Sequence, residues 1–301
     1  MSRNAFVITG GASLGAVHVG MLEALYEKGI TPDVIVGTSV GAINGAFIAS
    51  RPQTPGTAQD LGQVWRHLRR AEVFPLHFGE GLLGFVGRTS HFVPNRALKR
   101  LLARHLEPAR LEDSAIPLHV IATNALTGDE VRLSSGPIVE AVLASAAIPG
   151  VFPSIPIDDV PLIDGGASNF APISHAVELG ADTVYVLTSG SACALAKPPR
   201  GAIPMFLHST SLLVTRRLRA ETELLADRTR LVVLPPPCPV RVAPHDFSRA
   251  DELISASLET TRSFLDSASR TGTWTQFPAH LLGHHRNSSE FRTHPIQEAN
   301  S

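Results

Sequence analysis

Short apolar runs alternate with amphipathic segments over the first 50 residues. Residues 5–9 form an apolar run that ends in glycines, and residues 16–28 then carry apolar side chains at helical spacing. Gly29 follows as a natural helix terminator, and a second apolar run, 34–36, leads into a small-residue helix that runs to about Ala49. This order of strand, helix, strand and helix predicts a parallel sheet covered by helices.

The same pattern continues along the chain. We expect further helices at 58–70, 94–105, 204–227 and 248–268, and strands at 118–122, 130–133, 161–163, 183–187 and 231–234. A hairpin turn is expected at 127–129. The prediction is an α/β fold of three layers, with a mainly parallel central sheet and helices on both faces. One domain is expected over 1–268, and the polar, His-rich segment 269–301 is expected to be a loosely ordered tail.

The segment 73–95 departs from this pattern, because it mixes four Phe with four Gly and shows poor periodicity. Two interpretations stay open. The segment is either a long surface loop packed on the core, or an apolar flap over a substrate site. In the second case its apolar side chains, among them Leu82, Leu83, Phe85 and Val86, line an acyl channel.

Composition limits the classes of function. The 301 residues are 44% hydrophobic and 18% charged, as in a globular protein, and the net charge of −1 with no long Lys/Arg block argues against a nucleic-acid partner. No apolar run is long enough to span a membrane, and 5–8 is too short for a signal-peptide core. Cys193 and Cys238 show no metal-binding spacing and are too few for a disulfide framework, which fits a reducing compartment. We expect a cytoplasmic protein, in which surface contact with membranes stays possible, with no metal and no cofactor.

The first candidate for chemistry is Gly37-Thr38-Ser39-Val40-Gly41, at a strand-to-helix junction. It matches GxSxG in the context of a nucleophile elbow, where the serine adopts a strained conformation and the glycines prevent clashes. The following helix directs its N-terminal amides at the same place. The sequence therefore predicts Ser39 as a nucleophile, against the alternative of an ordinary tight turn.

The second candidate is the loop Gly10-Gly11-Ala12-Ser13-Leu14-Gly15 after the first strand. Its backbone N–H groups suit a phosphate or an oxyanion. The dinucleotide pattern GxGxxG fails at Ala12, and the loop lacks the Gly-Lys-Ser/Thr ending of a P-loop. An oxyanion hole fits better, and a nucleotide-binding Rossmann protein is an alternative that rests on this loop alone.

The third candidate is Asp164-Gly165-Gly166, after the predicted strand 161–163. By itself, Asp-Gly is usually a turn. In open α/β sheets, however, active residues gather at the carboxyl ends of parallel strands, where the other two candidates also lie. We therefore expect Asp164 to act as a general base for the serine.

Together these motifs resemble the patatin-like phospholipase family. The glycine-rich loop, the GxSxG elbow and the Asp-Gly-Gly site occur in the family's order, and "LASAAIPGVFPS" at 143–154 and "NFAPISHAVELGAD" at 169–182 are similar to it as well. The resemblance covers about 4–190. It implies a lipid acyl hydrolase with a Ser–Asp dyad: Ser39 as nucleophile, Asp164 as base, and the amides of Gly11, Ala12 and Ser13 as oxyanion hole. An acyl-serine ester forms and water hydrolyses it.

Two positions depart from the family pattern. Leu14 stands where the family usually carries Arg or Lys, and Ala12 stands where a third glycine is common. Ala12 keeps its N–H, so an oxyanion hole can still form. The loss of the cation at Leu14 weakens the case for a phospholipid and favours a neutral lipid or a small acyl ester as the substrate.

Alternative hypotheses concern a catalytic role for a histidine and the fate of the acyl group. A Ser-His-Asp triad needs a histidine, and His245, on a loop, is a better candidate than His175 or His208, which lie in helical segments. His18 is expected to be a packing residue. An acyltransferase shares the same acyl-enzyme, and a catalytically idle lipid-binding protein could share the same scaffold.

Overall fold

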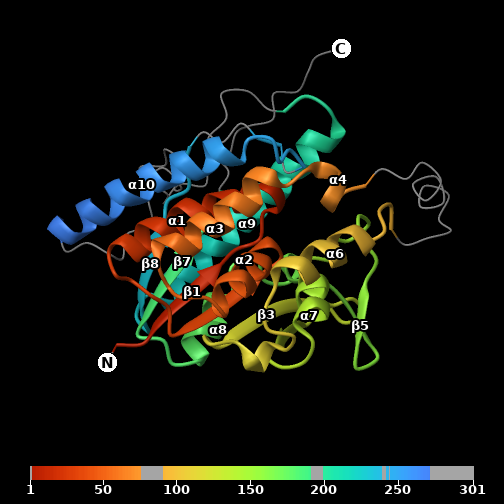
Figure 1. The fold of residues 1–301 in the computed structure, drawn as a ribbon, viewed down its shortest axis with the longest axis horizontal. Helices are drawn as coiled ribbons and strands as arrows, with labels where there is room; N and C mark the ends of the chain where they lie inside the picture. Colours follow the sequence, from red (N-terminus) through yellow and green to blue (C-terminus); the bar gives the residue numbers. More distant parts are fainter. Residues whose placement is uncertain (1, 76–90, 191–198, 239–241, 244, 272–301) are drawn as a thin grey trace, which may run out of the picture.

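The computed structural model describes residues 2–75, 91–190, 199–238, 242–243 and 245–271. Within them the chain forms one eight-stranded sheet with helices on both faces (Figure 1). The predicted α/β class with a central sheet is therefore confirmed.

The sheet has a parallel part and an antiparallel part. The parallel strands are β1 (Asn4–Ile8), β2 (Val34–Thr38), β3 (Leu118–Asn124), β7 (Thr183–Leu187) and β8 (Arg230–Leu234), in the order β3-β2-β1-β7-β8. The antiparallel strands are β4 (Glu130–Leu133), β5 (Ile155–Ile157) and β6 (Val160–Asp164); β4 and β6 pair with β3, and β5 pairs with β6.

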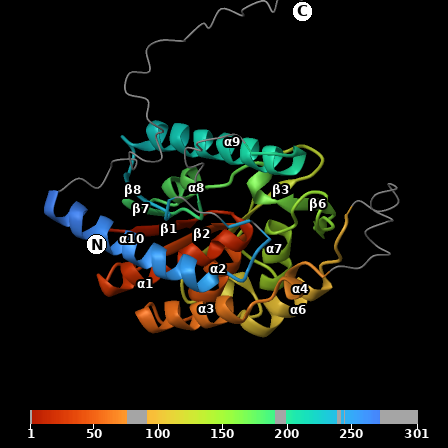
Figure 2. The ribbon, with the colours of Figure 1, turned by 90° about the horizontal axis from the view of Figure 1, so that it is seen from above.

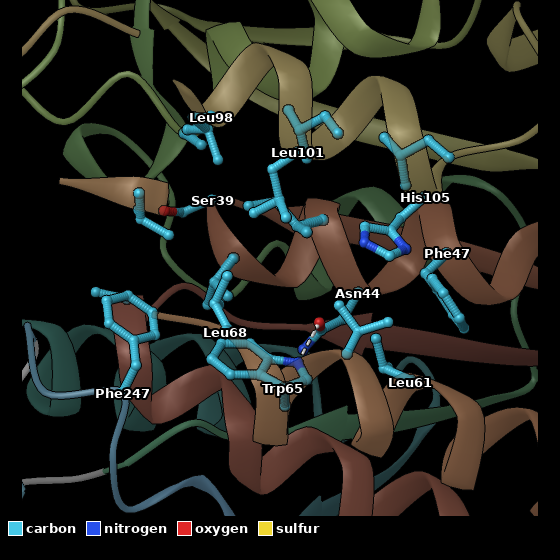
Figure 3. A pocket seen from close by; sticks show the side chains of 18 of the residues that line it. Ser39, Asn44, Phe47, Leu61, Trp65, Leu68, Leu98, Leu101, His105 and Phe247 are labelled. Atoms are coloured by element: carbon cyan, nitrogen blue, oxygen red, sulfur yellow. Dashed lines mark hydrogen bonds between the residues drawn. The ribbon is translucent and has the colours of Figure 1, made fainter. Parts of the chain in front are cut away.

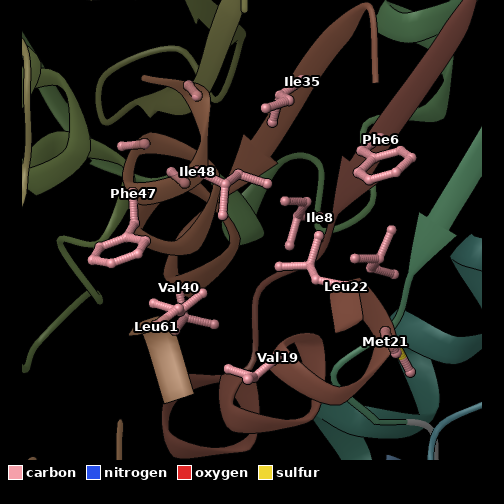
Figure 4. Close-up of a cluster of buried hydrophobic side chains, with 14 of the residues drawn as sticks. Phe6, Ile8, Val19, Met21, Leu22, Ile35, Val40, Phe47, Ile48 and Leu61 are labelled. Atoms are coloured by element: carbon pink, nitrogen blue, oxygen red, sulfur yellow. The ribbon is translucent and has the colours of Figure 1, made fainter. Parts of the chain in front are cut away.

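Alternate side chains of the parallel strands enter two separate cores. Phe6 and Ile8 of β1 belong to one core, and Ala5 and Val7 belong to the other. Burial on both faces explains why the strand sequence is continuously apolar. Figure 4 shows Phe6, Ile8 and Ile35 from the strands packed against side chains of the helices.

The helices divide unequally between the two faces (Figure 2). On one face lie α1 (Val17–Glu27), α2 (Val40–Ala49), α3 (Pro55–His67), α6 (Arg96–His105), α7 (Ile138–Ser145) and α10 (Ala250–Thr271), and on the other lie α8 (Ile173–Glu178) and α9 (Ala202–Leu225). Four short helices complete the described structure: η1 (Ala12–Ala16), α4 (Arg70–Val73), η2 (Leu111–Asp113) and η3 (Gly165–Ala167). The predicted strands and helices are all present with ends shifted by a few residues, whereas α7 and β5 were not predicted.

Some predictions fall outside the described residues. Most of the segment 73–95 lies there, with Leu82, Leu83, Phe85 and Val86, as does the tail from 272 onward, so the two interpretations of that segment and the prediction of a loosely ordered tail stay untested. In the described part, no helix is long and apolar enough to cross a membrane. Cys238 is disulfide-bonded, so the cysteines do not support the expectation of a reducing compartment.

Candidate active site

Ser39 lies at the sharp junction between β2 and α2. Its backbone has φ 56° and ψ −124°, a conformation that costs a non-glycine residue free energy. The flanking glycines allow the close packing that this turn needs. A Cβ added to Gly41 would lie 2.0 Å from the carbonyl oxygen of Ile8. A Cβ added to Gly37 would lie 2.7 Å from the carbonyl oxygen of Gly41. The local geometry is that of a nucleophile elbow, as the GxSxG motif predicts.

The strand that places Asp164 beside Ser39 runs in a different direction from the one predicted. This strand, β6, is antiparallel to β3, whereas we expected Asp164 at the end of a parallel strand. β3 pairs with β2 up to Thr38↔Ile121 and with β6 from Ala122↔Asp164, and β4 occupies its other edge. The carboxyl ends of β2 and β6 therefore meet head to head along one edge of β3, and this brings Asp164 beside Ser39.

The two side chains form a direct hydrogen bond. Ser39 Oγ donates to Asp164 Oδ2 at 2.6 Å, while Asp164 Oδ1 accepts from the amide of Gly166 at 2.7 Å. Both residues are buried, and burial raises the pKa of the Asp164 carboxyl to about 6, against the opposing effect of these two hydrogen bonds. At neutral pH the carboxylate is mostly ionised, yet it is a stronger base than an exposed aspartate.

The two glycines after Asp164 hold the turn against the sheet. A Cβ on Gly165 would lie 2.1 Å from the carbonyl oxygen of Ile121, so this position admits no side chain. Gly166 supplies the amide that fixes the carboxylate. Both motif glycines thus help to set the orientation of Asp164.

The glycine-rich loop lies next to Ser39. Gly11 has φ 142° and Ala12 has φ 51°, and no described residue accepts a hydrogen bond from either amide. Ala12 lines the same cavity as Ser39. Ser13 Oγ donates to the carbonyl of Ala243 at 3.0 Å, and Leu14 packs partly buried against the core, so the loop is anchored without a basic side chain.

Gly10 and Gly15 have other contacts. The amide of Gly10 donates to the carbonyl of Phe170 at 3.3 Å, which leaves it no free hydrogen for a ligand. Gly15 packs on α2, where an added Cβ would lie 2.4 Å from Val40 Cγ2. Of the loop residues predicted to bind substrate, Gly11 and Ala12 are therefore the best placed donors.

An apolar cavity extends from Ser39 between α2, α3 and α6 (Figure 3). Its walls are almost entirely hydrocarbon; the labelled side chains include Leu61, Leu68, Leu98, Leu101 and Phe247. Besides Ser39 and His105 the polar lining residue is Asn44, whose Oδ1 accepts from Trp65 Nε1 at 3.1 Å and whose Nδ2 donates to the carbonyl of Gly15 at 3.0 Å. Because its hydrogen bonds are satisfied within the protein, Asn44 does not disturb the apolar character of the cavity.

The described histidines do not contact Ser39 or Asp164. His245 is exposed in a surface pocket beside Arg66 and Asp246, and His175 Nε2 bonds Glu130 Oε2 at 2.9 Å. His18 is fully buried and bonds Asn44 at 3.1 Å; burial lowers the pKa of its imidazole to about 3. Within the described ranges, no group of three His, Cys, Asp or Glu side chains is arranged to hold a metal ion.

One residue that contacts Ser39 was not predicted from the sequence. Ser145, at the end of α7, accepts a hydrogen bond from the amide of Ser39 at 2.8 Å and donates to the carbonyl of Ile121 at 2.5 Å. It therefore ties the strained turn to the centre of the sheet. The only available signal was its position within the "LASAAIPG" stretch of the family resemblance.

Known proteins share sequence with the part of the chain that holds these motifs. Patatin-like phospholipase domain-containing protein 6 of Homo sapiens is 29% identical over 190 residues, which are 62% of this chain and 13% of that protein. Lysophospholipase nte1 of Aspergillus terreus is 28% identical over 192 residues, 62% of this chain and 12% of that protein. The match thus spans about an eighth of the length of these relatives.

Solved structures give more distant matches. VipD from Legionella pneumophila is 14% identical with a TM-score of 0.47, over 89% of this chain and 67% of that chain. Human GIVD cytosolic phospholipase A2 is 12% identical with a TM-score of 0.47, over 90% of this chain and 59% of that chain. The sequence profile described as Patatin-like phospholipase matches residues 6–177, more than half of this chain and all three predicted motifs. The chain belongs to the patatin-like phospholipase family.

Proposed function

We propose that this protein is a serine acyl hydrolase that cleaves carboxylic esters of lipids or related acyl esters through a Ser39–Asp164 dyad. The observation that carries the proposal is the 2.6 Å hydrogen bond from Ser39 Oγ to Asp164 Oδ2 at the end of an apolar cavity. A serine on a strained turn, bonded to a buried carboxylate, has the geometry of an activated nucleophile.

In the first half-reaction, Ser39 Oγ attacks the ester carbonyl while its proton passes to Asp164 Oδ2. The C–O bond to the leaving alcohol then breaks, the alkoxide takes the proton from Asp164, and an acyl-Ser39 ester remains. In the second half-reaction, Asp164 removes a proton from water and the hydroxide attacks the acyl carbonyl. The bond between the acyl carbon and Ser39 Oγ then breaks, Oγ takes the proton back from Asp164, and the carboxylic acid is released. The raised pKa of Asp164 suits both transfers, because a base with a pKa near the working pH accepts and returns protons readily.

The negative charge on the tetrahedral oxygen needs donors on the other side of the carbonyl. The amides of Gly11 and Ala12 supply them in this proposal, because both lack an acceptor among the described residues and Ala12 faces the cavity beside Ser39. Backbone donors fixed in place contribute strongly to such reactions, since they need no reorganisation when charge develops.

The apolar cavity suits a substrate with a hydrocarbon chain. An acyl group in it contacts leucine and phenylalanine side chains, and burial stabilises each methylene by about 0.8 kcal/mol. Relatives named as phospholipases and lysophospholipases support a lipid ester as substrate. Such a substrate resides in membranes or micelles, so the proposal includes transient contact with a lipid surface.

Hydrolysis of a p-nitrophenyl ester series by the wild type, Ser39→Ala, Asp164→Asn and His245→Ala tests the proposal. We expect both dyad variants to lose activity by about a thousandfold or more, as for other catalytic units. His245→Ala should keep wild-type activity and serves as the control against a triad. Full activity of Ser39→Ala would exclude the dyad, and a wild type that binds lipid without turnover would indicate an idle binding protein instead.

A further inference from the structure

The apolar cavity behind Ser39 has a defined length. Figure 3 shows Ser39 at one end, Leu98 and Leu68 near it, Leu101 midway, and His105 and Phe47 at the opposite end. Because α2 and α6 both run along the cavity, its length follows from the helical rise of 1.5 Å per residue. It is about 12 Å from Ser39 to Phe47 and about 10 Å from Leu98 to His105. The two helices therefore give similar lengths, about 10–12 Å.

At the far end, Phe47 is held by a specific set of contacts. The Arg51 guanidinium lies 3.9 Å from the centroid of the Phe47 ring. Arg51 also donates to the carbonyl of Phe47 at 2.6 Å and to that of His105 at 3.1 Å, so it joins the C-terminal ends of α2 and α6. Phe47 is 5% exposed, and its ring stands between the cavity and this cation. An alkyl chain that reaches Phe47 meets a braced wall.

The chemistry of that wall suits the methyl end of a chain. Burial, together with the positive charges of Arg104 and Arg51, lowers the pKa of the His105 imidazole, which is thus kept neutral at neutral pH. The opposing Leu61 side chain is 2% exposed. The guanidinium of Arg51 is screened from the cavity by the Phe47 ring that it covers, in a cation–π contact.

We infer that this cavity sets the acyl-chain specificity: it holds a chain of about ten carbons, and Phe47, braced by Arg51, is the residue that stops longer chains. An extended chain advances about 1.25 Å per carbon, given C–C bonds of about 1.5 Å, so a 12 Å channel holds roughly ten. The inference rests on the proposed function, because it takes Ser39 to be the point where the acyl carbonyl is held.

The test is the profile of kcat/KM against chain length, from acetyl to hexadecanoyl p-nitrophenyl esters, at concentrations below micelle formation. The wild type should be fastest with octanoyl or decanoyl ester. The rate constant should fall by about tenfold or more at tetradecanoyl, because the added methylenes cannot enter the channel. Phe47→Ala should move the optimum to longer chains by roughly three to four carbons, about the depth of the removed ring.

Two further variants guard against a folding failure of Phe47→Ala. Phe47→Leu keeps most of the buried volume and should move the optimum by about one or two carbons in the same direction. Leu101→Trp places a larger side chain midway along the channel and should move the optimum in the opposite direction, to butanoyl or hexanoyl ester. Phe206→Ala is the matched control: Phe206 lies on α9, on the other face of the sheet, and is 69% exposed, so its profile should equal the wild type's.

The outcomes separate this inference from the proposed function. A wild-type optimum at hexadecanoyl ester, or a profile that neither Phe47 variant nor Leu101→Trp moves, overturns the chain-length inference while the dyad stands. If the wild type hydrolyses none of the esters in a Ser39-dependent way, the acetyl ester included, the proposed function itself is overturned. Opposite shifts in the Phe47 and Leu101 variants, with Phe206→Ala unchanged, would establish the channel and its end.

Discussion

Replacing Asp164 with asparagine, its neutral isostere, should make the protein more stable. In wild type, burial raises the pKa of Asp164 from 3.8 to about 6, so folding disfavours the ionised carboxylate. Asp164→Asn has no charge to desolvate. Its Oδ1 can accept from the Gly166 amide and its Nδ2 can donate to Ser39 Oγ, so both present hydrogen bonds keep a counterpart.

The magnitude follows from proton linkage. Between pH 3.8 and about 6 the folded wild type binds more protons than the unfolded chain, so its stability falls as the pH rises through this window. A shift of about two pKa units corresponds to roughly 3 kcal/mol above pH 6, and to nothing below pH 3.8. Asp164→Asn should therefore exceed the wild type by about 2–3 kcal/mol at pH 8, with the difference declining toward zero at pH 4.

Urea unfolding of both proteins at pH 4, 5, 6, 7 and 8 measures this difference. Asp60→Asn is the matched control, because Asp60 is an exposed aspartate on α3; that substitution should change stability by less than about 0.5 kcal/mol at every pH. A less stable Asp164→Asn at pH 8, or a gain that does not depend on pH, would refute the account of a buried, destabilised carboxylate.

Three other predictions follow from the same geometry. The kcat/KM of ester hydrolysis should fall about tenfold per pH unit below pH 6, as Asp164 becomes protonated; a rate that stays constant to pH 4.5 would contradict its role as base. Ser145→Ala removes the acceptor for the Ser39 amide and should cost about 1–3 kcal/mol in urea unfolding, and it should lower kcat more than it raises KM; an unchanged kcat would count against a positioning role. Gly41→Ala places a Cβ 2.0 Å from the Ile8 carbonyl oxygen, so the variant should be insoluble or its free energy of unfolding should fall by more than about 3 kcal/mol. An unfolding curve equal to that of the wild type would show that the turn is packed less tightly than described.

Much of the sheet could be predicted because its strands are buried on both faces. β1 and β7 are short, continuous apolar runs with glycine or polar residues at their ends, and such runs locate a strand to within a residue or so. The helix α7 was not predicted, because it is eight residues long and buried on nearly every side. Its sequence, IVEAVLAS, has no amphipathic period to separate helix from strand.

The direction of β6 could not be read from the sequence. Strand direction depends on tertiary pairing, and the pairing of β6 with β3 joins Asp164 to Ser39 across 125 residues of chain. The motifs identified both residues but not the strand pairing that brings them together. Ser145 was missed for a related reason: a serine at the end of a short, mostly apolar helix has no local signature, and its role arises only where the helix end meets the Ser39 amide.

Covalent trapping tests the proposed Ser39–Asp164 dyad most directly. A fluorophosphonate ester phosphonylates an activated serine, so peptide mapping by mass spectrometry after stoichiometric reaction identifies the nucleophile. The account predicts one adduct on Ser39 in the wild type, none in Ser39→Ala, and labelling slowed by about a hundredfold or more in Asp164→Asn, which lacks the base. An adduct on another serine, or equal labelling rates in the wild type and Asp164→Asn, would contradict it.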